Sequence, residues 1–211
     1  MAKDVLGVDW GGVLFYFDEK HFRRLIRKEK LHLIPAVIDL HESGQIQLRD
    51  MYQKLCSEDF FKKQMFWEEF AHICAKCLRG IHEPMFNTLS ELKKGGRARL
   101  IAITDNNPFF FYLTTLKFPK IFPLFREGTK DRLMISFEIG SVKTALMPYV
   151  LAPSRFGFGH DKIAFVDNRA DNVAKFIEVF KNPDAGFLYD QKSKRNHAQF
   201  LKFLDKHFPA K

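Results

Sequence analysis

The sequence predicts an α/β protein: a Rossmann-like, doubly wound parallel sheet that carries an inserted α-helical cap. Two observations predict this fold class. Short aliphatic runs alternate with helical patterns along most of the chain, as expected of parallel strands joined by crossover helices. One interruption of about ninety residues separates the first aliphatic run from the second, far more than a single crossover needs.

Short apolar runs mark the predicted strands. None of them alternates between polar and apolar residues, which is typical of strands buried on both faces of a parallel sheet. Four are clear, and a fifth completes the set: residues 5–8, 100–103, 133–135, 163–166 and 186–189. Helical patterns lie between them, for example at 84–94, which is followed by Gly95 and Gly96, and at 171–179.

The long interruption is the predicted cap. Residues 18–79 have a helical pattern throughout, broken at Gly44, and Ser57 is predicted to cap a following helix. Because the insertion leaves the carboxyl end of a strand, it lies over the edge where open α/β sheets bind ligands, and it can act as a lid. The predicted domains are an α/β core of residues 1–17 and 80–211 and a helical cap subdomain of residues 18–79.

The composition suits a soluble protein with a sizeable core, since 46% of the 211 residues are hydrophobic and 28% are charged. No apolar run approaches the roughly 18 residues that span a bilayer, and the N-terminus lacks the apolar stretch of a signal peptide. We therefore expect a cytoplasmic protein without membrane insertion. The sequence does not indicate an oligomeric state.

The formal net charge of +9 favours anionic partners such as phosphate esters, nucleic acid or acidic lipid. The basic runs at 21–30 and 192–195 are interpreted as solvated helix or loop faces. Nucleic-acid binding stays open as an alternative, but no nucleic-acid-binding motif supports it.

Two further segments are interpreted structurally. Cys74 and Cys77 form a C-x-x-C pair inside a helical pattern, and we expect them to be buried as small apolar residues, since the other ligands of a zinc site are missing. The Phe-rich segment 109–125 is expected to form a buried helix and a proline-broken connection packed under the sheet. An exposed aromatic patch for membrane or partner contact is the alternative.

Polar residues follow four of the predicted strands. Because the carboxyl ends of parallel strands meet at one edge of the sheet, these residues are expected to converge on one crevice. In chain order they are Asp9; Thr104, Asp105, Asn106 and Asn107; Lys143; and Asp167, Asn168, Asp171 and Asn172.

This set of residue types suits phosphoryl transfer. Asp9 and Asp167 offer the paired carboxylates that Mg²⁺ prefers, and one carboxylate oxygen can attack phosphorus to form an aspartyl-phosphate. Lys143 can neutralise the nucleophile and the phosphate together. The Thr104 hydroxyl and the backbone N–H groups after it can hold the transferring oxygens. Gly11 and Gly12 allow the backbone to approach the phosphate closely.

These segments resemble the four motifs of the haloacid dehalogenase-like (HAD) hydrolases. VDWGGVLF resembles motif I, ITDNN motif II, SFEIGSVK motif III and FVDNRADN motif IV, in order from residue 5 to about residue 172. The insertion resembles the cap of the subgroup capped after motif I. The segment ESGQI at 42–46 resembles a cap segment of the small sugar-phosphate phosphatases of this subgroup.

The resemblance implies a role for each matching residue. Asp9 and Lys143 are the expected catalytic residues, with Asp9 as the nucleophile. Phosphate binding is expected at Gly12, Thr104, Asp105, Asn106 and Lys143. The resemblance implies Mg²⁺ as cofactor, near Asp9, the Gly11 carbonyl, Asp167, Asn168 and Asp171.

One departure from the family pattern affects the function. Most phosphatases of the family carry a second Asp two residues after the nucleophile, as general acid and base, and here that position is Gly11. The favoured function is a Mg²⁺-dependent phosphatase acting on a small phosphorylated metabolite. A catalytically impaired binding or regulatory protein and a phosphonatase-like hydrolase remain alternatives. No cap residue stands out as the determinant of the substrate.

Overall fold

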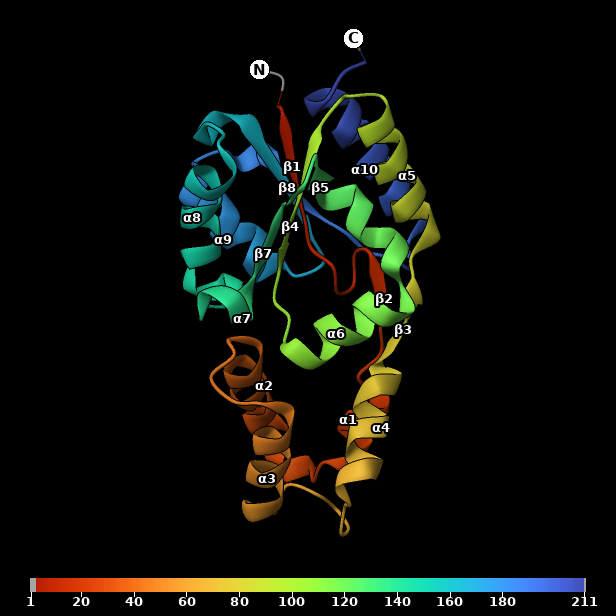
Figure 1. The fold of residues 1–211 in the computed structure, drawn as a ribbon, viewed down its shortest axis with the longest axis vertical. Coiled ribbons are helices and arrows are strands. Elements are labelled where there is room, and N and C mark those ends of the chain that lie inside the picture. The colour runs from red at the N-terminus through yellow and green to blue at the C-terminus, as the bar shows by residue number, and fades with distance from the viewer. Residues whose placement is uncertain (1–2, 211) are drawn as a thin grey trace.

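The computed structural model describes residues 3–210 and contains a five-stranded parallel sheet in the order β7-β4-β1-β8-β9 (Figure 1). All five predicted strands are confirmed, with ends that differ by at most one residue. Their bounds are β1 (Val5–Val8), β4 (Arg99–Thr104), β7 (Leu133–Ile135), β8 (Ile163–Asp167) and β9 (Gly186–Leu188).

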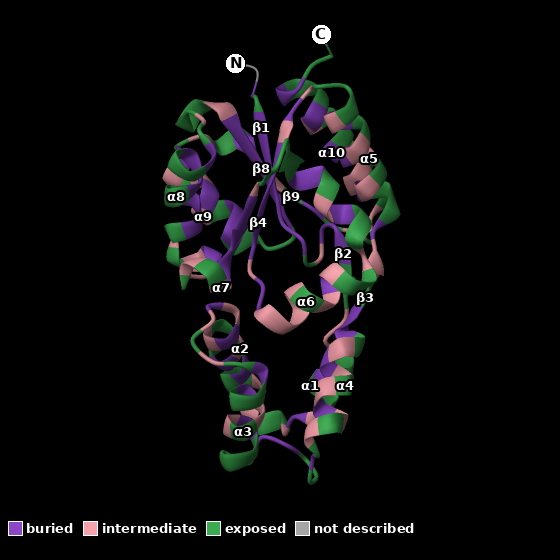
Figure 2. Cartoon of the chain, viewed as in Figure 1, coloured by how far each residue is buried: buried purple, intermediate pink, exposed green. Residues whose placement is uncertain are grey.

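Helices cover both faces of the sheet, which explains the unbroken apolar character of its central strands. In Figure 1, α8 (Met147–Phe156) and α9 (Ala170–Phe180) lie on one side, and α5 (Glu83–Lys94) and α10 (Lys194–His207) lie on the other. The predicted helices at 84–94 and 171–179 are therefore confirmed. The residues of β1, β8 and most of β4 are buried (Figure 2).

The cap segment, defined as residues 18–79, lies beyond the carboxyl edge of the sheet (Figure 1). Its apolar residues form a hydrophobic cluster of their own, separate from the cluster around the sheet. Phe70 is at the centre of several aromatic contacts there. Its elements are α1 (Lys20–Leu25), η1 (Lys28–Leu33), α2 (Ile34–Glu42), α3 (Leu48–Ser57) and α4 (Trp67–Cys77).

Details of the cap segment differ from the prediction. Ser57 ends α3 instead of capping a following helix, because its hydroxyl donates to the Lys54 carbonyl of the same helix. Helix α4 begins only at Trp67, so the segment is not helical throughout. The predicted break at Gly44 is confirmed, since α2 ends two residues before it.

The sequence did not predict the link between the cap segment and the sheet. Strand β2 (Phe15–Phe17) pairs antiparallel with β3 (Leu78–Ile81), with a register shift between Tyr16 and Phe17. This two-stranded ribbon carries the chain out to the cap segment and back. Each strand is too short and too variably buried to show a periodic pattern.

The Phe-rich segment forms the expected elements in a different place. Helix α6 (Pro108–Lys117) lies at the carboxyl edge of the sheet, beside the cap segment, and is not packed under the sheet (Figure 1). Tyr112 and Leu116 are about 60% exposed, and Phe110 packs against both hydrophobic clusters. The proline-broken connection is η2 (Pro119–Phe125), with Ile121, Leu124 and Phe125 buried.

The cysteine prediction is confirmed. Cys74 and Cys77 are free thiols buried in the cap segment cluster. Burial raises the pKa of Cys74 to about 12 and that of Cys77 to about 11, which keeps both thiols protonated near neutral pH. Within residues 3–210, no helix combines the length and the apolar character needed to cross a bilayer.

Gly44 is expected to fix how the end of α2 sits on the core. Its φ is +75°, and a Cβ there would lie 3.0 Å from the Phe137 carbonyl oxygen. Gly96 has a similar φ of +63° with open space around it.

We predict that Gly96→Ala lowers the free energy of unfolding by about 1–2 kcal/mol through backbone strain, and that Gly44→Ala lowers it by about 1 kcal/mol more through crowding. Urea unfolding measures the free energy of unfolding of both variants. Equal losses would contradict the role of Gly44 in packing the end of α2 against the core.

Candidate active site

The predicted site residues come together at the carboxyl edge of the sheet. Asp9 directly follows β1, Thr104 ends β4 and Asp167 ends β8, so three adjacent strands deliver them side by side. Lys143 begins the short helix η3 (Lys143–Ala145), which contacts α9 and α8. The parallel arrangement predicted from the sequence is what brings these residues to one place.

Lys143 forms ion pairs with both carboxylates. Its Nζ lies 2.7 Å from Asp9 Oδ1 and 2.5 Å from Asp167 Oδ2. None of the three residues is more than 5% exposed. Buried charges are tolerated when they are paired and hydrogen-bonded, so each member of this cluster depends on the other two.

Hydrogen bonds from neighbouring residues fix the cluster. The Arg169 backbone N–H donates to Asp167 Oδ1 at 2.8 Å, and Asn172 Nδ2 donates to Asp167 Oδ2 at 3.0 Å. The Lys143 backbone N–H donates to Asp105 Oδ1 at 2.8 Å. The sequence analysis noted Asn172 without giving it a role, although its place five residues after Asp167, at the start of a helix, was a usable signal.

The surroundings shift the pKa values of the cluster in opposite directions. Burial raises the pKa of Asp9, the Lys143 charge opposes this shift, and the Asp167 charge adds to it. Burial alone would lower the pKa of Lys143, but the carboxylates of Asp167, Asp9 and Asp105 raise it well above its usual value. Lys143 is therefore a fixed positive charge facing Asp9.

Oxygen atoms converge beside Asp9 in a way that suits a cation. One terminal atom of the Asn168 amide lies 2.9 Å from the Gly11 carbonyl oxygen and 3.3 Å from Asp9 Oδ2. If that atom is the amide nitrogen, it donates to both oxygens. If it is the amide oxygen, three oxygens face one another with no proton between them, and a cation is required. The residues present therefore fit Mg²⁺, which favours carboxylate and carbonyl oxygens.

Gly12 makes room for this arrangement. Its φ is +75°, and a Cβ would lie 2.2 Å from Asn168 Nδ2. Only glycine combines this backbone conformation with such close approach. Within residues 3–210, no three His, Cys, Asp or Glu side chains cluster as metal ligands, so backbone and amide oxygens would have to complete the site.

Asp171 is held away from this group. Its carboxylate accepts two hydrogen bonds from the Arg169 guanidinium, at 3.1 and 2.6 Å, and its side chain is half exposed. These bonds lower the pKa of Asp171. In the structure Asp171 positions Arg169, and a role at the metal remains only a prediction from the sequence.

The loop after β4 is already bonded internally. The Asn106 backbone N–H donates to Ser136 Oγ at 2.9 Å, and the Asn107 N–H donates to Asn106 Oδ1 at 2.9 Å. These two N–H groups are therefore used within the protein in this conformation. The Thr104 hydroxyl makes only a long bond of 3.4 Å to the Asp105 carbonyl, which leaves it the better candidate for a phosphate oxygen.

A cavity of about 350 Å³ lies over the cluster, a size that suits a small ligand. The core contributes Asp9, Gly11, Gly12, Asp105, Lys143, Asn168, Arg169 and Asn172 to its lining, and the ribbon and cap segment contribute Phe17, Glu19, Lys20, Arg23 and Glu42. Positive side chains thus reach the cavity from both sides, as an anionic ligand requires. The sequence analysis missed Arg169, Lys20, Arg23 and Glu42, because the contact between the two parts is not encoded locally.

Glu42 is the least expected member of this lining. It ends α2, its residue is half-buried, and no hydrogen bond to its carboxylate is formed within residues 3–210. Burial, assisted by the Asp105 charge and opposed by Lys143, raises the pKa of Glu42 to about 8. Glu42 is the first residue of the ESGQI segment. The sequence analysis singled out this segment but did not predict a role for its Glu.

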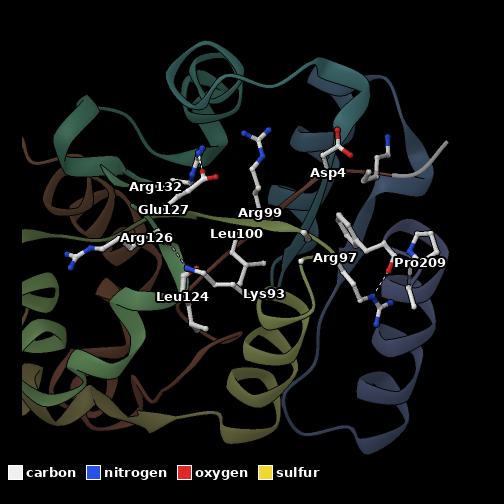
Figure 3. A pocket seen from close by; sticks show the side chains of 15 residues that line it. Asp4, Lys93, Arg97, Arg99, Leu100, Leu124, Arg126, Glu127, Arg132 and Pro209 are labelled. Carbon is white, nitrogen blue, oxygen red and sulfur yellow. Dashed lines mark hydrogen bonds and ion pairs between the residues drawn. The ribbon is translucent and has the colours of Figure 1, made fainter. Parts of the chain in front are cut away.

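A larger cavity, about 630 Å³, lies at the opposite edge of the sheet, and none of the site residues line it (Figure 3). Its lining is rich in Lys and Arg, but most of those charges have internal partners. Arg97 pairs with Asp205 and Arg126 with Asp131. Lys93 donates to the carbonyls of residues 123, 124 and 126. These cations hold the edge of the core together.

Comparisons with known proteins agree with this description. No model of a protein family matches the chain, and no curated protein sequence matches it. A HAD family enzyme from Bacteroides thetaiotaomicron superimposes with a TM-score of 0.73 over 94% of this chain and 99% of its own, at 14% identity. Another structure of that enzyme, in complex with magnesium and inorganic phosphate, gives a TM-score of 0.69 over 93% and 99%, at 15% identity.

A predicted HAD-like family hydrolase from Porphyromonas gingivalis gives a TM-score of 0.72 over 96% of this chain and 99% of its own, at 19% identity. A putative β-phosphoglucomutase from Bacteroides vulgatus gives 0.57 over 99% and 91%, at 13% identity. Identities this low establish the fold alone. The motif resemblance and the superpositions agree, and the chain has the fold of the haloacid dehalogenase-like enzymes.

Proposed function

We propose that this protein is a Mg²⁺-dependent phosphatase that hydrolyses small phosphate monoesters through a phosphoryl group carried on Asp9. The observation that carries the proposal is the buried Asp9–Lys143–Asp167 cluster, which faces a cavity of about 350 Å³. A scaffold protein has no need for two buried carboxylates around one lysine, since an apolar replacement is often as stable.

The residues that would hold Mg²⁺ are Asp9, the Gly11 carbonyl and Asp167, with the Asn168 amide oxygen beside them. When bound, the ion would shield the negative charges of carboxylate and phosphate from each other. The magnesium and phosphate present in the structure of the Bacteroides thetaiotaomicron enzyme support this choice. Asp171 is left out because Arg169 binds its carboxylate.

The protein's own residues account for the transfer. Lys143 binds Asp9 Oδ1, which leaves Asp9 Oδ2 as the attacking oxygen and keeps the nucleophile beside a positive charge. Lys143 and the Thr104 hydroxyl are placed to bind phosphate oxygens. Lys20, Arg23 and Arg169 line the cavity and attract the anionic ester. Gly12 allows the Asn168 amide to lie against the loop that follows Asp9.

We predict that Asp9→Asn abolishes turnover, because an amide cannot form the phosphoryl intermediate. The variant should still fold, with a lower free energy of unfolding, because Lys143 loses one ion pair and keeps the one with Asp167. The assay uses an aryl phosphate with Mg²⁺ and again with EDTA, and circular dichroism monitors the fold. Beryllium fluoride should form an adduct with the wild-type protein and none with the variant, as measured by mass spectrometry or fluorine NMR. Failure of the wild-type protein to form any adduct with Mg²⁺ present would favour the binding-protein alternative.

We predict that the wild-type protein binds one Mg²⁺ and that Asp167→Asn weakens the affinity by about tenfold or more, as loss of a metal-site group does. Isothermal titration calorimetry with Mg²⁺ measures this without any turnover. Asp171→Asn is the matched control. It makes the same substitution at a carboxylate that is paired with Arg169, outside the proposed metal site, so it should change the affinity little. Equal effects of the two substitutions would place Asp171 in the metal site after all.

A further inference from the structure

We infer that Glu42 is the acid that protonates the leaving oxygen when Asp9 attacks the phosphate ester. This inference rests on the proposed function. It names the residue that donates a proton to the leaving oxygen, a step for which Gly11 provides no side chain. An alkoxide is a poor leaving group, so cleavage of an alkyl phosphate requires a proton donor near the ester oxygen. The inference rests on position, chemical state and the absence of a better donor in the cavity.

The position of Glu42 follows from the geometry of phosphoryl transfer. The attacking and leaving oxygens lie roughly in line on opposite sides of phosphorus. Asp9 attacks from the end of β1, so the leaving oxygen faces away from the sheet, toward the cap segment. Glu42 lines the same cavity as Asp9 from that side. It also lines a smaller adjoining cavity with Gly11 and Thr104.

Two contacts hold Glu42 against the core. Its backbone carbonyl accepts a hydrogen bond from Ser136 Oγ at 2.5 Å, and the same hydroxyl contacts the backbone of Asn106. Two residues later, Gly44 packs closely on Phe137. The end of α2 is thus fixed to the loop that follows β4 and to the short helix α7 (Ser136–Ile139) that follows β7.

The chemical state of Glu42 suits an acid. Burial and the negative charge of Asp105 raise its pKa to about 8, and the positive charges of Lys143 and Arg169 oppose the shift. Asp39, on the same helix, adds a further raising contribution. A group with this pKa carries its proton at neutral pH and can release it to an alkoxide.

Other groups in the lining are worse donors. Lys143 is held between two carboxylates that raise its pKa, which makes its proton hard to release. Burial raises the pKa of Asp105 too, but its carboxylate already accepts the backbone N–H of Lys143 at 2.8 Å and is bound to the core. Glu19 forms an ion pair with Arg23 at 2.7 Å. Glu42 is the acid in this lining for which the described residues provide neither an ion pair nor a side-chain hydrogen bond.

The proton balance closes over two steps. In the first, an Asp9 oxygen bonds to phosphorus, the ester P–O bond breaks with its electron pair going to the leaving oxygen, and Glu42 gives that oxygen its proton. In the second, water attacks phosphorus, the bond to Asp9 breaks and restores the carboxylate, and Glu42 takes a proton from the water. Glu42 ends the cycle protonated, as it began.

We predict that Glu42→Gln lowers kcat/KM for an alkyl phosphate by about 10²-fold or more, and for an aryl phosphate with an activated leaving group by less than about threefold. Only the alkyl ester needs the proton. Glu29→Gln is the matched control, because it makes the same substitution at an exposed position of the cap segment and should affect neither substrate. Equal losses with both esters, or no loss with either, would overturn the inference.

The pH dependence gives a second readout. Glu42 acts as an acid only when protonated, so wild-type kcat/KM for the alkyl ester should fall as the pH rises through about 8. Glu42→Gln cannot lose a proton and should lack this decline, whereas persistence of the decline would assign it to another group. A wild-type protein that hydrolyses neither ester would refute the proposed function itself, and the inference would fall with it.

We predict that Gly11→Asp rescues Glu42→Gln. A Cβ at Gly11 meets no atom within 4 Å, and its φ lies outside the left-handed region, so the loop accepts a side chain. A carboxyl group there would lie beside the nucleophile and supply the missing proton. The double variant should recover about tenfold or more of the lost kcat/KM for the alkyl ester. Gly11→Asn on the same background is the control, and equal rescue by Asn would contradict the proton-transfer explanation.

Discussion

The ion pairs between Lys143 and the two buried carboxylates are the constraint on which the rest of the structure depends. Asp9 and Asp167 end adjacent strands, and neither tolerates burial without a cation between them. Removing one member of such a buried group typically costs about 3–5 kcal/mol. The loop that delivers Lys143 must therefore return to this edge of the sheet, and the hydrogen bonds from Asn172 and to Asp105 are built around that requirement.

The parts of the structure predicted from the sequence are those with a local signature. Buried parallel strands appear as short aliphatic runs, and the residues after each run must meet at one edge. Asp9, Thr104, Lys143 and Asp167 could therefore be grouped from the sequence alone. The ribbon of β2 and β3 could not be predicted in this way, because its pairing joins residues more than sixty positions apart. The role of Glu42 depends on the same kind of long-range contact.

The position of α6 shows how composition can mislead. Consecutive Phe residues suggested burial beneath the sheet, but Phe110 and its neighbours fill the junction between two separate hydrophobic clusters. A junction of this kind needs large apolar side chains without needing a fully enclosed helix, and it leaves Tyr112 and Leu116 exposed. Asn107 caps the helix by accepting from the Phe110 N–H, and this bond links the junction to the loop after β4.

The ribbon of β2 and β3 also has a mechanical consequence. It is the covalent link between the cap segment and the sheet, and its register shifts between Tyr16 and Phe17. An irregular two-stranded ribbon bends more easily than the helices on either side of it. In Figure 1 the ribbon lies on one side of the molecule, and α2 lies across from it. A small rotation at this ribbon would displace the end of α2 much further than the ribbon itself, so it would have to break the hydrogen bond between Ser136 and the Glu42 carbonyl.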